Sequence, residues 1–181
     1  MPAYHITGPS GSGKSTVGKI LQKRGFRVIE TDFEPGLSGW VHSETKEKVT
    51  ETPPQPFPKD WVAAYGWLWD ETRTKEILAE IGNEPVFFVG GAYNEKDLYH
   101  LFEKRFGLFV DSDTLVKRLQ AREPERWKDG SAELRKLLDW NTRSKQFNES
   151  HGAISIDSSE DPEVIADVIL KHITADETAT Q

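Results

Sequence analysis

The stretch Gly8-Pro9-Ser10-Gly11-Ser12-Gly13-Lys14-Ser15 decides the fold class of this chain of 181 residues. It matches the pattern G-x-x-x-x-G-K-[ST] at every position. A short apolar run at residues 3–7 precedes it, and apolar residues at positions 17, 20 and 21 follow it with helical spacing. Glycines let the backbone curl so that its N–H groups point inward, and the following helix adds its positive N-terminal end. The stretch therefore predicts a strand, a phosphate-binding loop and a helix.

The polar side chains of this loop each have a chemical task in binding a nucleoside triphosphate. Lys14 is expected to reach the β- and γ-phosphates, and the hydroxyl of Ser15 is expected to ligate Mg²⁺. Thr16 is expected to touch the α-phosphate, while the backbone from Gly8 to Gly13 surrounds the phosphates. We therefore predict ATP and Mg²⁺ as cofactors, and the reaction has to be inferred from the rest of the chain.

The remaining sequence alternates short apolar runs with amphipathic segments. After the first strand at 3–7, further strands are expected at 26–30, 85–89, 106–110 and 153–156. Helical spacing predicts helices around positions 17–21, 98–102, 115–119, 134–138 and 164–169. The run at 85–89 is apolar throughout, which is typical of a strand buried on both faces of a parallel sheet. The chain is thus predicted to form an α/β fold, a three-layer P-loop NTPase fold with a five-stranded parallel sheet and helices on both faces.

We expect one domain over residues 1–173 and a flexible tail over 174–181. Residues 34–82 are predicted to form an inserted acceptor-binding region. Its first part, 34–59, carries Pro35, Gly36 and Gly39 and then, within the segment 43–59, four prolines in six residues at positions 53, 54, 56 and 58; it is expected to be an exposed loop or flap. Helical spacing from 61 to 81 predicts one long helix or two short ones. Residues 122–131 hold six charged residues within eight positions and are predicted to be a short, solvated lid.

Composition excludes several other kinds of protein. The formal net charge is −7, which argues against a protein that coats nucleic acid or an anionic membrane. The chain has no cysteine, so disulfides, thiolate catalysis and Cys-ligated metals are excluded. No apolar run approaches the ~20 residues of a membrane span, and the N-terminus does not resemble a secretory signal. We therefore expect a cytoplasmic protein with a small-molecule partner and with no membrane or nucleic-acid partner, and its oligomeric state stays open.

Three classes of proteins with a phosphate loop fit the sequence poorly. GTPases read their base with N-K-x-D, and the nearest string, Asn94-Glu95-Lys96-Asp97, has a different order. An ABC-type ATPase has a long signature stretch, of which Leu37-Ser38-Gly39 is only a short echo. AAA+ modules are longer and carry an acidic pair at the end of a central strand, where this chain has Val89-Gly90-Gly91.

The chain resembles the small P-loop kinases, the group of shikimate kinase, gluconate kinase and adenylate kinase, over most of residues 3–172. Thr31-Asp32-Phe33-Glu34 looks like the D-x-D of shikimate kinase, with Glu34 in place of the second Asp. By that resemblance Asp32 lies near Mg²⁺ and the acceptor hydroxyl, whereas a turn or helix-capping role is the alternative. Gly90-Gly91 looks like the glycine turn by which shikimate kinase meets its acceptor, with an ordinary strand-to-helix turn as the alternative.

Arg118 and Arg122 are four residues apart, so they share one helix face. They look like the arginine pair at the lid of adenylate and shikimate kinases, where one arginine stacks on adenine or holds phosphates. Such cations meet the negative charge of the transition state in a dry site. Solvated surface arginines are the alternative, and this alternative is stronger for Arg126, which lies in the lid itself.

The inserted region is rich in aromatic residues, namely Trp40, Trp61, Tyr65, Trp67 and Trp69. They are either walls for a flat acceptor such as a nucleoside or core residues under a flap. Arg73 is either a clamp for an acceptor phosphate or carboxylate, or a partner of Asp70 or Glu76 on its own helix. The candidate substrate residues are Asp32, Glu34, Trp40, Arg73, Gly90 and Gly91.

The resemblance implies an ATP-dependent small-molecule kinase that transfers the γ-phosphoryl group to a hydroxyl or phosphate of a small acceptor. Lys14, Asp32, Arg118 and Arg122 would carry the catalysis, and Ser15 and Asp32 would hold the metal. A nucleoside or nucleotide is the first expected acceptor, and a sugar acid or polyol the second. The alternatives are a non-kinase P-loop ATPase or nucleotide switch acting on a protein partner, and a polynucleotide kinase.

Overall fold

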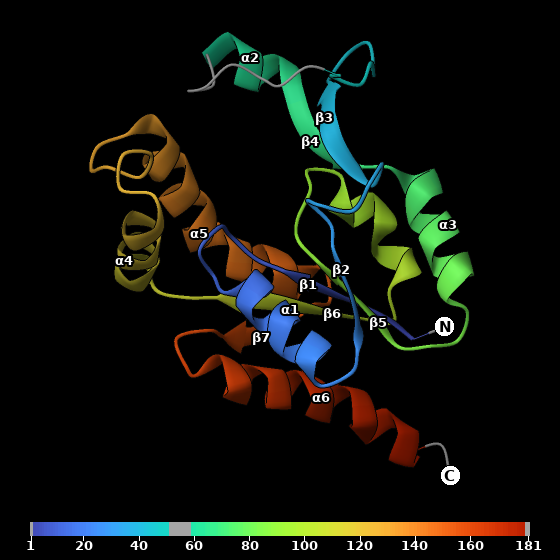
Figure 1. Ribbon diagram of the computed structural model, residues 1–181. Coiled ribbons are helices and arrows are strands. Elements are labelled where there is room, and N and C mark those ends of the chain that lie inside the picture. Colours follow the sequence, from blue (N-terminus) through green and yellow to red (C-terminus); the bar gives the residue numbers. More distant parts are fainter. Residues whose placement is uncertain (1, 51–58, 180–181) are drawn as a thin grey trace.

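The computed structural model describes residues 2–50 and 59–179, which form a parallel β-sheet between two layers of helices (Figure 1). The sheet strands are β1 (Ala3–Thr7), β2 (Arg27–Glu30), β5 (Val86–Val89), β6 (Lys104–Phe109) and β7 (Ile154–Asp157). Their order is β2-β5-β1-β6-β7, and all neighbours are parallel. The predicted five-stranded sheet is confirmed, with the limits of β1 as predicted and those of the other strands within two residues of the predicted ones.

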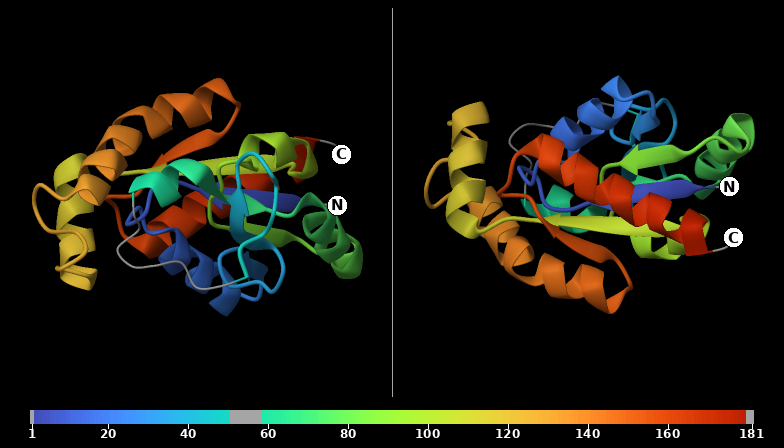
Figure 2. Two further views of the ribbon diagram at one scale, coloured as in Figure 1. Left: turned by 90° about the horizontal axis from the view of Figure 1, so that it is seen from above. Right: turned by 90° about the horizontal axis from the view of Figure 1, so that it is seen from below.

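Helices cover both faces of this sheet (Figure 2). On one face α1 (Lys14–Lys23) and α6 (Pro162–Ala179) pack their apolar residues against β1, β5 and β6 in the larger core cluster. The other face is covered by α3 (Glu71–Ile81), by the 3₁₀ helix η1 (Glu95–Leu101) and by α5 (Ala132–Ser150). The predicted three-layer arrangement is therefore confirmed.

The inserted region contains an antiparallel pair of strands, called the hairpin below, whose first strand lies where the sequence predicts a loop and whose second strand lies where it predicts helix. Strand β3 (Ser38–His42) pairs antiparallel with β4 (Tyr65–Trp69), which follows the short helix α2 (Lys59–Ala64). The prediction of helix across Tyr65–Trp69 is wrong because alternating aromatic side chains favour a strand, where they pair across the hairpin. Trp40 lies opposite Trp67, with ring centroids 5.5 Å apart. The four prolines of the predicted flap lie outside the described residues.

The lid region follows α4 (Ser112–Arg122) and leads into α5. The sequence predicts a solvated loop here, but Trp127 is buried against Leu115, Leu119 and Leu134 between the two helices. This correction has a simple physical reason, since the single aromatic residue of a charged segment has apolar surface to bury. Trp127 therefore anchors the segment to α4 and α5.

Two further differences concern helix ends and type. The segment 95–101 forms a 3₁₀ helix, and α6 continues to Ala179, well into the segment predicted to be a tail. In the described part of the chain, no helix has the length and apolar character needed to cross a membrane.

Candidate active site

The phosphate-binding loop connects the end of β1 to the start of α1. Gly8, Gly11 and Gly13 have φ angles of 144°, 85° and 97°, a region that disfavours residues with a Cβ atom. At Gly8 a Cβ would also lie 2.4 Å from the carbonyl oxygen of Leu108. The glycines of the motif are therefore required by the loop geometry that leads into the N-terminus of α1.

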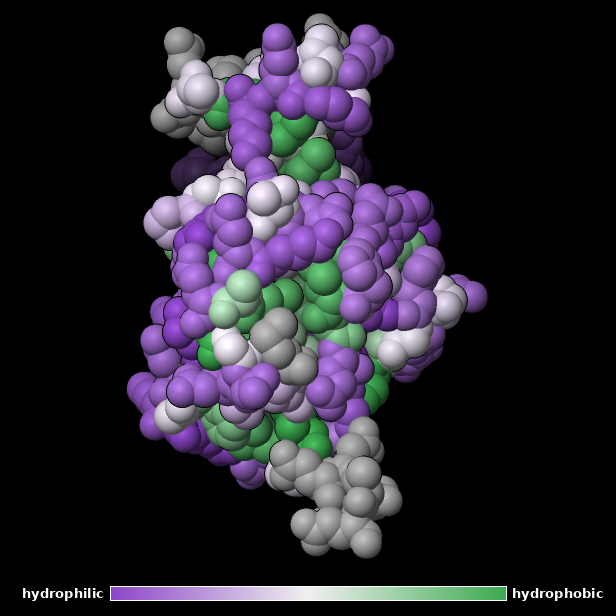
Figure 3. Space-filling view, turned by 90° about the vertical axis from the view of Figure 1, so that its right-hand side faces the viewer, coloured by the Kyte–Doolittle hydropathy of each residue, from purple (hydrophilic) through white to green (hydrophobic). Residues whose placement is uncertain are grey.

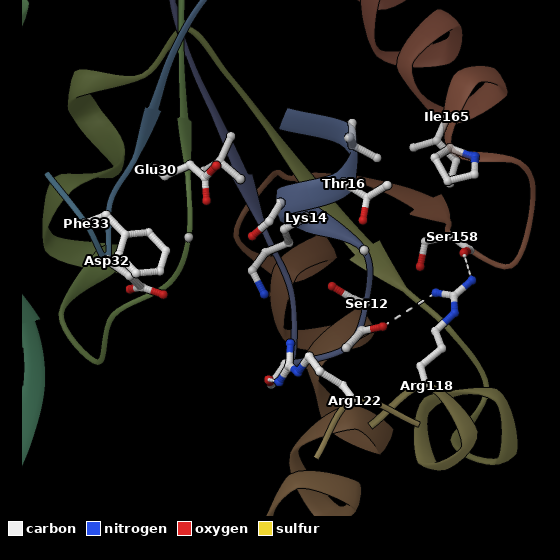
Figure 4. Close-up of a pocket in the computed structure, with 18 residues that line it drawn as sticks. Ser12, Lys14, Thr16, Glu30, Asp32, Phe33, Arg118, Arg122, Ser158 and Ile165 are labelled. Carbon is white, nitrogen blue, oxygen red and sulfur yellow. Dashed lines mark hydrogen bonds between the residues drawn. The ribbon is translucent and has the colours of Figure 1, made fainter. Parts of the chain in front are cut away.

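A cavity of about 450 Å³ opens over this loop (Figure 4). Its lining consists of Ser10, Gly11, Ser12, Gly13, Lys14, Ser15, Thr16, Val17, Glu30, Asp32, Phe33, Val89, Gly90, Arg118, Arg122, Ser158, Pro162 and Ile165. All four residues that the sequence predicts to be catalytic, and all predicted loop residues from 10 to 16, thus lie around one cavity. Gly8 and Pro9 complete the loop without lining the cavity.

Lys14 crosses the mouth of the loop. Its Nζ donates hydrogen bonds to the carbonyl oxygens of Gly8, at 2.7 Å, and Pro9, at 2.9 Å. Burial lowers the pKa of this ammonium group to about 8, although the nearby carboxylates of Asp32 and Glu95 oppose the shift. The site therefore holds an amine whose charged form is disfavoured by burial and is stabilised by the nearby carboxylates.

Arg118 and Arg122 reach from α4 to the phosphate loop, although the side chain of Arg122 is 53% exposed and also forms an ion pair with Glu123 at 3.1 Å. Arg118 donates to the carbonyl oxygens of Ser158, at 2.8 Å, and Gly11, at 3.5 Å. Arg122 donates to the hydroxyl of Ser10 at 3.3 Å. Three cations, counting Lys14, therefore surround the space where a triphosphate would lie.

Arg126 has a different environment from the arginine pair. It forms ion pairs with Glu123 and Glu133, at 3.3 Å each, and its guanidinium lies over the ring of Trp127. It does not line the cavity. These contacts agree with the surface alternative that the sequence left open for this residue.

Asp32 stands on the opposite side of the cavity from α4, at the carboxyl end of β2 (Figure 4). Its Oδ1 accepts a hydrogen bond from the indole Nε1 of Trp67 at 3.0 Å. The hairpin of the inserted region thereby fixes the carboxylate. The neighbouring Glu30 and Phe33 also line the cavity, and sequence reasoning missed both, although their position next to Asp32 was an available signal.

Gly90 and Gly91 differ in their surroundings. Gly90 lines the cavity, and a Cβ there would lie 1.8 Å from Oγ1 of the buried Thr31. A Cβ at Gly91 would make only ordinary contacts, at 3.6 Å or more, and this residue is not part of the lining. The absence of a side chain at Gly90 therefore serves close packing of the backbone on Thr31.

Three other predicted substrate residues also lie outside the cavity lining, namely Glu34, Trp40 and Arg73. Trp40 packs edge-on against Trp61 and Trp67 in the hairpin, so it belongs to an aromatic cluster. Arg73 forms ion pairs with Glu34, Glu76 and Glu80. The partnership with Glu76 was one of the sequence alternatives, whereas the clamp expected of Arg73 would require these ion pairs to break.

Glu95 is a buried carboxylate that sequence reasoning did not single out. It is almost inaccessible to solvent, and its Oε2 accepts a hydrogen bond from the hydroxyl of Thr7 at 3.0 Å. Its other oxygen accepts from the hydroxyl of Tyr99 at 3.3 Å. His5, 3.9 Å away, has its pKa lowered chiefly by burial. The two residues that follow β5 are glycines and carry no charge. Glu95, which lies a few residues further along in η1, places a carboxylate near this end of the strand.

The donor atoms in the cavity fit Mg²⁺. The hydroxyl of Ser15 and the carboxylate of Asp32 both line it, and oxygen atoms of one or two such side chains, together with phosphate oxygens, are typical ligands of this ion. Among the described residues there is no group of three or more His, Cys, Asp or Glu side chains that could hold a metal by themselves. A metal here would therefore be held jointly by the chain and a nucleotide.

Solved structures share the fold over nearly the whole chain. Shikimate kinase from Acinetobacter baumannii in complex with shikimate has a TM-score of 0.61 and 20% identity, covering 97% of this chain and 94% of that one. An uncharacterized protein from Eubacterium ventriosum has a TM-score of 0.56 and 17% identity, covering 96% and 98%. A gluconokinase from Sinorhizobium meliloti has a TM-score of 0.48 and 19% identity, covering 91% and 87%. The first of these confirms, at the level of fold, the resemblance to small P-loop kinases.

Sequence comparison identifies the family. No curated protein matches the chain as a sequence relative. The family described as AAA domain matches residues 5–139, about three quarters of the chain. The sequence was expected not to fit AAA+ modules, because these are longer and carry an acidic pair where Gly90-Gly91 follows β5 here; the family match overturns that expectation. With this match and a complete phosphate-binding loop, the chain belongs to the AAA domain family of P-loop proteins.

Proposed function

We propose that the protein is a phosphotransferase that moves the γ-phosphoryl group of ATP-Mg²⁺ to a small acceptor. The observation that carries the proposal is the arrangement of charge in one cavity. Lys14, Arg118 and Arg122 stand around the phosphate loop, and the carboxylate of Asp32 faces them from the end of β2. Phosphoryl transfer requires the donor phosphate and the acceptor to be held next to each other. The cations would bind the donor, and the carboxylate on the opposite side would orient the acceptor.

Each of these side chains has a role in the proposed reaction. Lys14 and the loop amides bind and orient the triphosphate, while Arg118 and Arg122 neutralise the charge that spreads over the γ-phosphoryl group. Ser15 and Asp32 would hold Mg²⁺, which when bound neutralises phosphate charge. Asp32, kept in place by Trp67, would orient the acceptor.

With a hydroxyl acceptor, one bond to the γ-phosphorus forms as another breaks. The acceptor oxygen forms a bond to the γ-phosphorus, and the bond from that phosphorus to the β–γ bridging oxygen breaks. ADP leaves with the electron pair, and the hydroxyl proton passes to the carboxylate of Asp32 and on to solvent. The neighbouring fold of a shikimate kinase, which was solved with shikimate, supports a small molecule as the acceptor.

The proposal is tested by measuring ADP release from ATP-Mg²⁺ with and without small acceptors: nucleosides, nucleotides, sugar acids and polyols. We expect one acceptor class to raise ADP release at least about tenfold above the rate with water. Lys14→Ala should abolish this increase, whereas Lys19→Ala, on the exposed side of α1, should preserve it. Tight ATP binding with an ADP release that no acceptor changes would contradict the proposal and favour an ATPase or switch that acts on a protein.

A further inference from the structure

The side of the cavity opposite α4, where an acceptor would bind, is negatively charged. We call it the acceptor wall and define it by Glu30, Asp32, Phe33 and Gly90, which lie at the carboxyl ends of β2 and β5. It holds two carboxylates and no basic side chain. The cations of the cavity are Lys14, Arg118 and Arg122, and each of them donates a hydrogen bond to the phosphate loop. Arg118 also donates to Ser158, and Arg122 also pairs with Glu123. They are therefore placed for the triphosphate.

Among the described residues near the hairpin, Arg73, Lys48 and Lys75 are paired with carboxylates, while Lys46 donates to the carbonyl oxygen of Ser43. Arg73 bonds through its guanidinium to Glu34 at 3.3 Å, Glu76 at 3.3 Å and Glu80 at 3.2 Å, and only 28% of its side chain is exposed. The other ion pairs of this part of the described chain are Lys48 with Asp70 and Lys75 with Glu71, at 2.6 Å each. Seen from the side of α3, hydrophilic side chains cover most of the surface (Figure 3).

Phe33 gives the acceptor wall an apolar element next to its carboxylate. Its side chain is 79% exposed, which is unusual for a phenylalanine, and it lines the cavity beside Asp32. The carboxylate of Asp32 is in turn held by the indole of Trp67. An acceptor would thus meet a fixed hydrogen-bond acceptor for a hydroxyl group and an apolar ring for its carbon skeleton.

We infer that the acceptor is a hydroxyl compound that carries no phosphate or carboxylate group and that packs an apolar face on Phe33. An anionic acceptor would bring its charge next to the carboxylate of Glu30, and the acceptor wall has no basic side chain to compensate it. Mg²⁺ held by Asp32 would already be shared with the phosphates of the nucleotide. This inference rests on the proposed phosphotransfer. It excludes nucleotides and sugar acids as acceptors and retains nucleosides and neutral polyols with an apolar face.

The test compares matched acceptors that differ only in charge: adenosine with AMP, glucose with gluconate, and shikimate methyl ester with shikimate. ADP release is measured for each at equal ionic strength, and kcat/KM is determined for the acceptor. We expect the neutral member of the best pair to exceed its anionic partner by about tenfold or more. A preference for the anionic member, or equal use of both, would overturn the inference.

Two variants test the residues that carry the inference. Phe33→Ala should lower kcat/KM for the neutral acceptor by about tenfold and leave KM for ATP unchanged, whereas Val168→Ala, on the outer face of α6, should change neither. Glu30→Gln removes one carboxylate of the acceptor wall and should reduce the discrimination against the anionic member about fivefold. Glu80→Gln removes a carboxylate of α3 that does not line the cavity, and should leave the discrimination unchanged. Equal effects of Glu30→Gln and Glu80→Gln would overturn the role given to the charge of the acceptor wall.

The results separate this inference from the proposed function. Turnover of anionic acceptors alone would overturn the inference and leave phosphotransfer standing. ADP release that no acceptor, neutral or anionic, raises above the rate with water would contradict phosphotransfer and, with it, the inference.

Discussion

Gly90 shows how one residue position couples the fold to the cavity. Its φ of 155° and the 1.8 Å approach of a would-be Cβ to Thr31 leave no room for a side chain. We therefore expect Gly90→Ala to destabilise the protein by about 3 kcal/mol, because either Thr31 or the end of β5 must shift. Urea denaturation would measure this change in the free energy of unfolding.

Gly91→Ala provides the matched control for that measurement. The added Cβ would meet only ordinary van der Waals contacts, so the free energy of unfolding should change by less than about 1 kcal/mol. Equal unfolding midpoints for the two variants would contradict the packing role that we assign to Gly90. The sequence suggested one shared role for the two glycines and could not separate them, since only the path of the neighbouring strand β2 brings Thr31 against Gly90.

Among single residues, those of the phosphate loop were predictable because their chemistry is local in sequence. A loop of eight residues carries its own backbone geometry and its own charge, whatever surrounds it. Glu95 and Arg73 were not predictable in this way. Glu95, in η1, accepts a hydrogen bond from Thr7 of β1, which is far away in the sequence. Arg73 binds Glu34, which lies 39 residues away.

The hairpin of β3 and β4 is the element that connects the inserted region to the cavity. Trp67→Phe keeps an aromatic ring in β4 but removes the N–H group that donates to Asp32. We expect kcat to fall about fivefold, the equivalent of roughly 1 kcal/mol for one exposed hydrogen bond to a charged group, with KM for ATP unchanged.

Trp69→Phe is the control on the same strand, since the buried indole N–H of Trp69 has no hydrogen-bond partner among the described residues. It should lower stability through lost packing and leave kcat within about twofold of the wild-type value. If Trp67→Phe and Trp69→Phe reduced kcat equally, the contact with Asp32 would have no special role.

The type of an element was predictable where its sequence showed a single apolar pattern. The prediction failed where helical spacing and strand alternation occurred in the same segment. The strands of the parallel sheet are short apolar runs that end at turn residues, and all five were predicted. In 61–69 the apolar positions satisfy both a helical spacing and the alternation of Tyr65, Trp67 and Trp69. Pairing with β3 decides in favour of a strand from position 65, and such pairing depends on a segment more than 20 residues away.

At the scale of the molecule, the strand order explains how the cavity is assembled. In a parallel sheet of order β2-β5-β1, the carboxyl ends of neighbouring strands meet at one edge. Asp32, Gly90 and the phosphate loop follow these three ends, so the topology brings them together although the sequence separates them by tens of residues. The placement of Asp32 and Gly90 was predictable once the parallel sheet was assumed, whereas the acceptor side depends on the inserted hairpin and was predicted only in part.

In the proposed reaction the γ-phosphoryl group of ATP passes to an acceptor other than water. Following a labelled γ-phosphate to its product is the sharpest test of this transfer. The protein is incubated with ATP labelled at the γ-phosphate, Mg²⁺ and the acceptor that raises ADP release most, and the products are separated. We expect most of the label to appear covalently bound to the acceptor, and Lys14→Ala to abolish this product. Label that appears only as inorganic phosphate, at the same rate with and without the acceptor, would contradict this transfer.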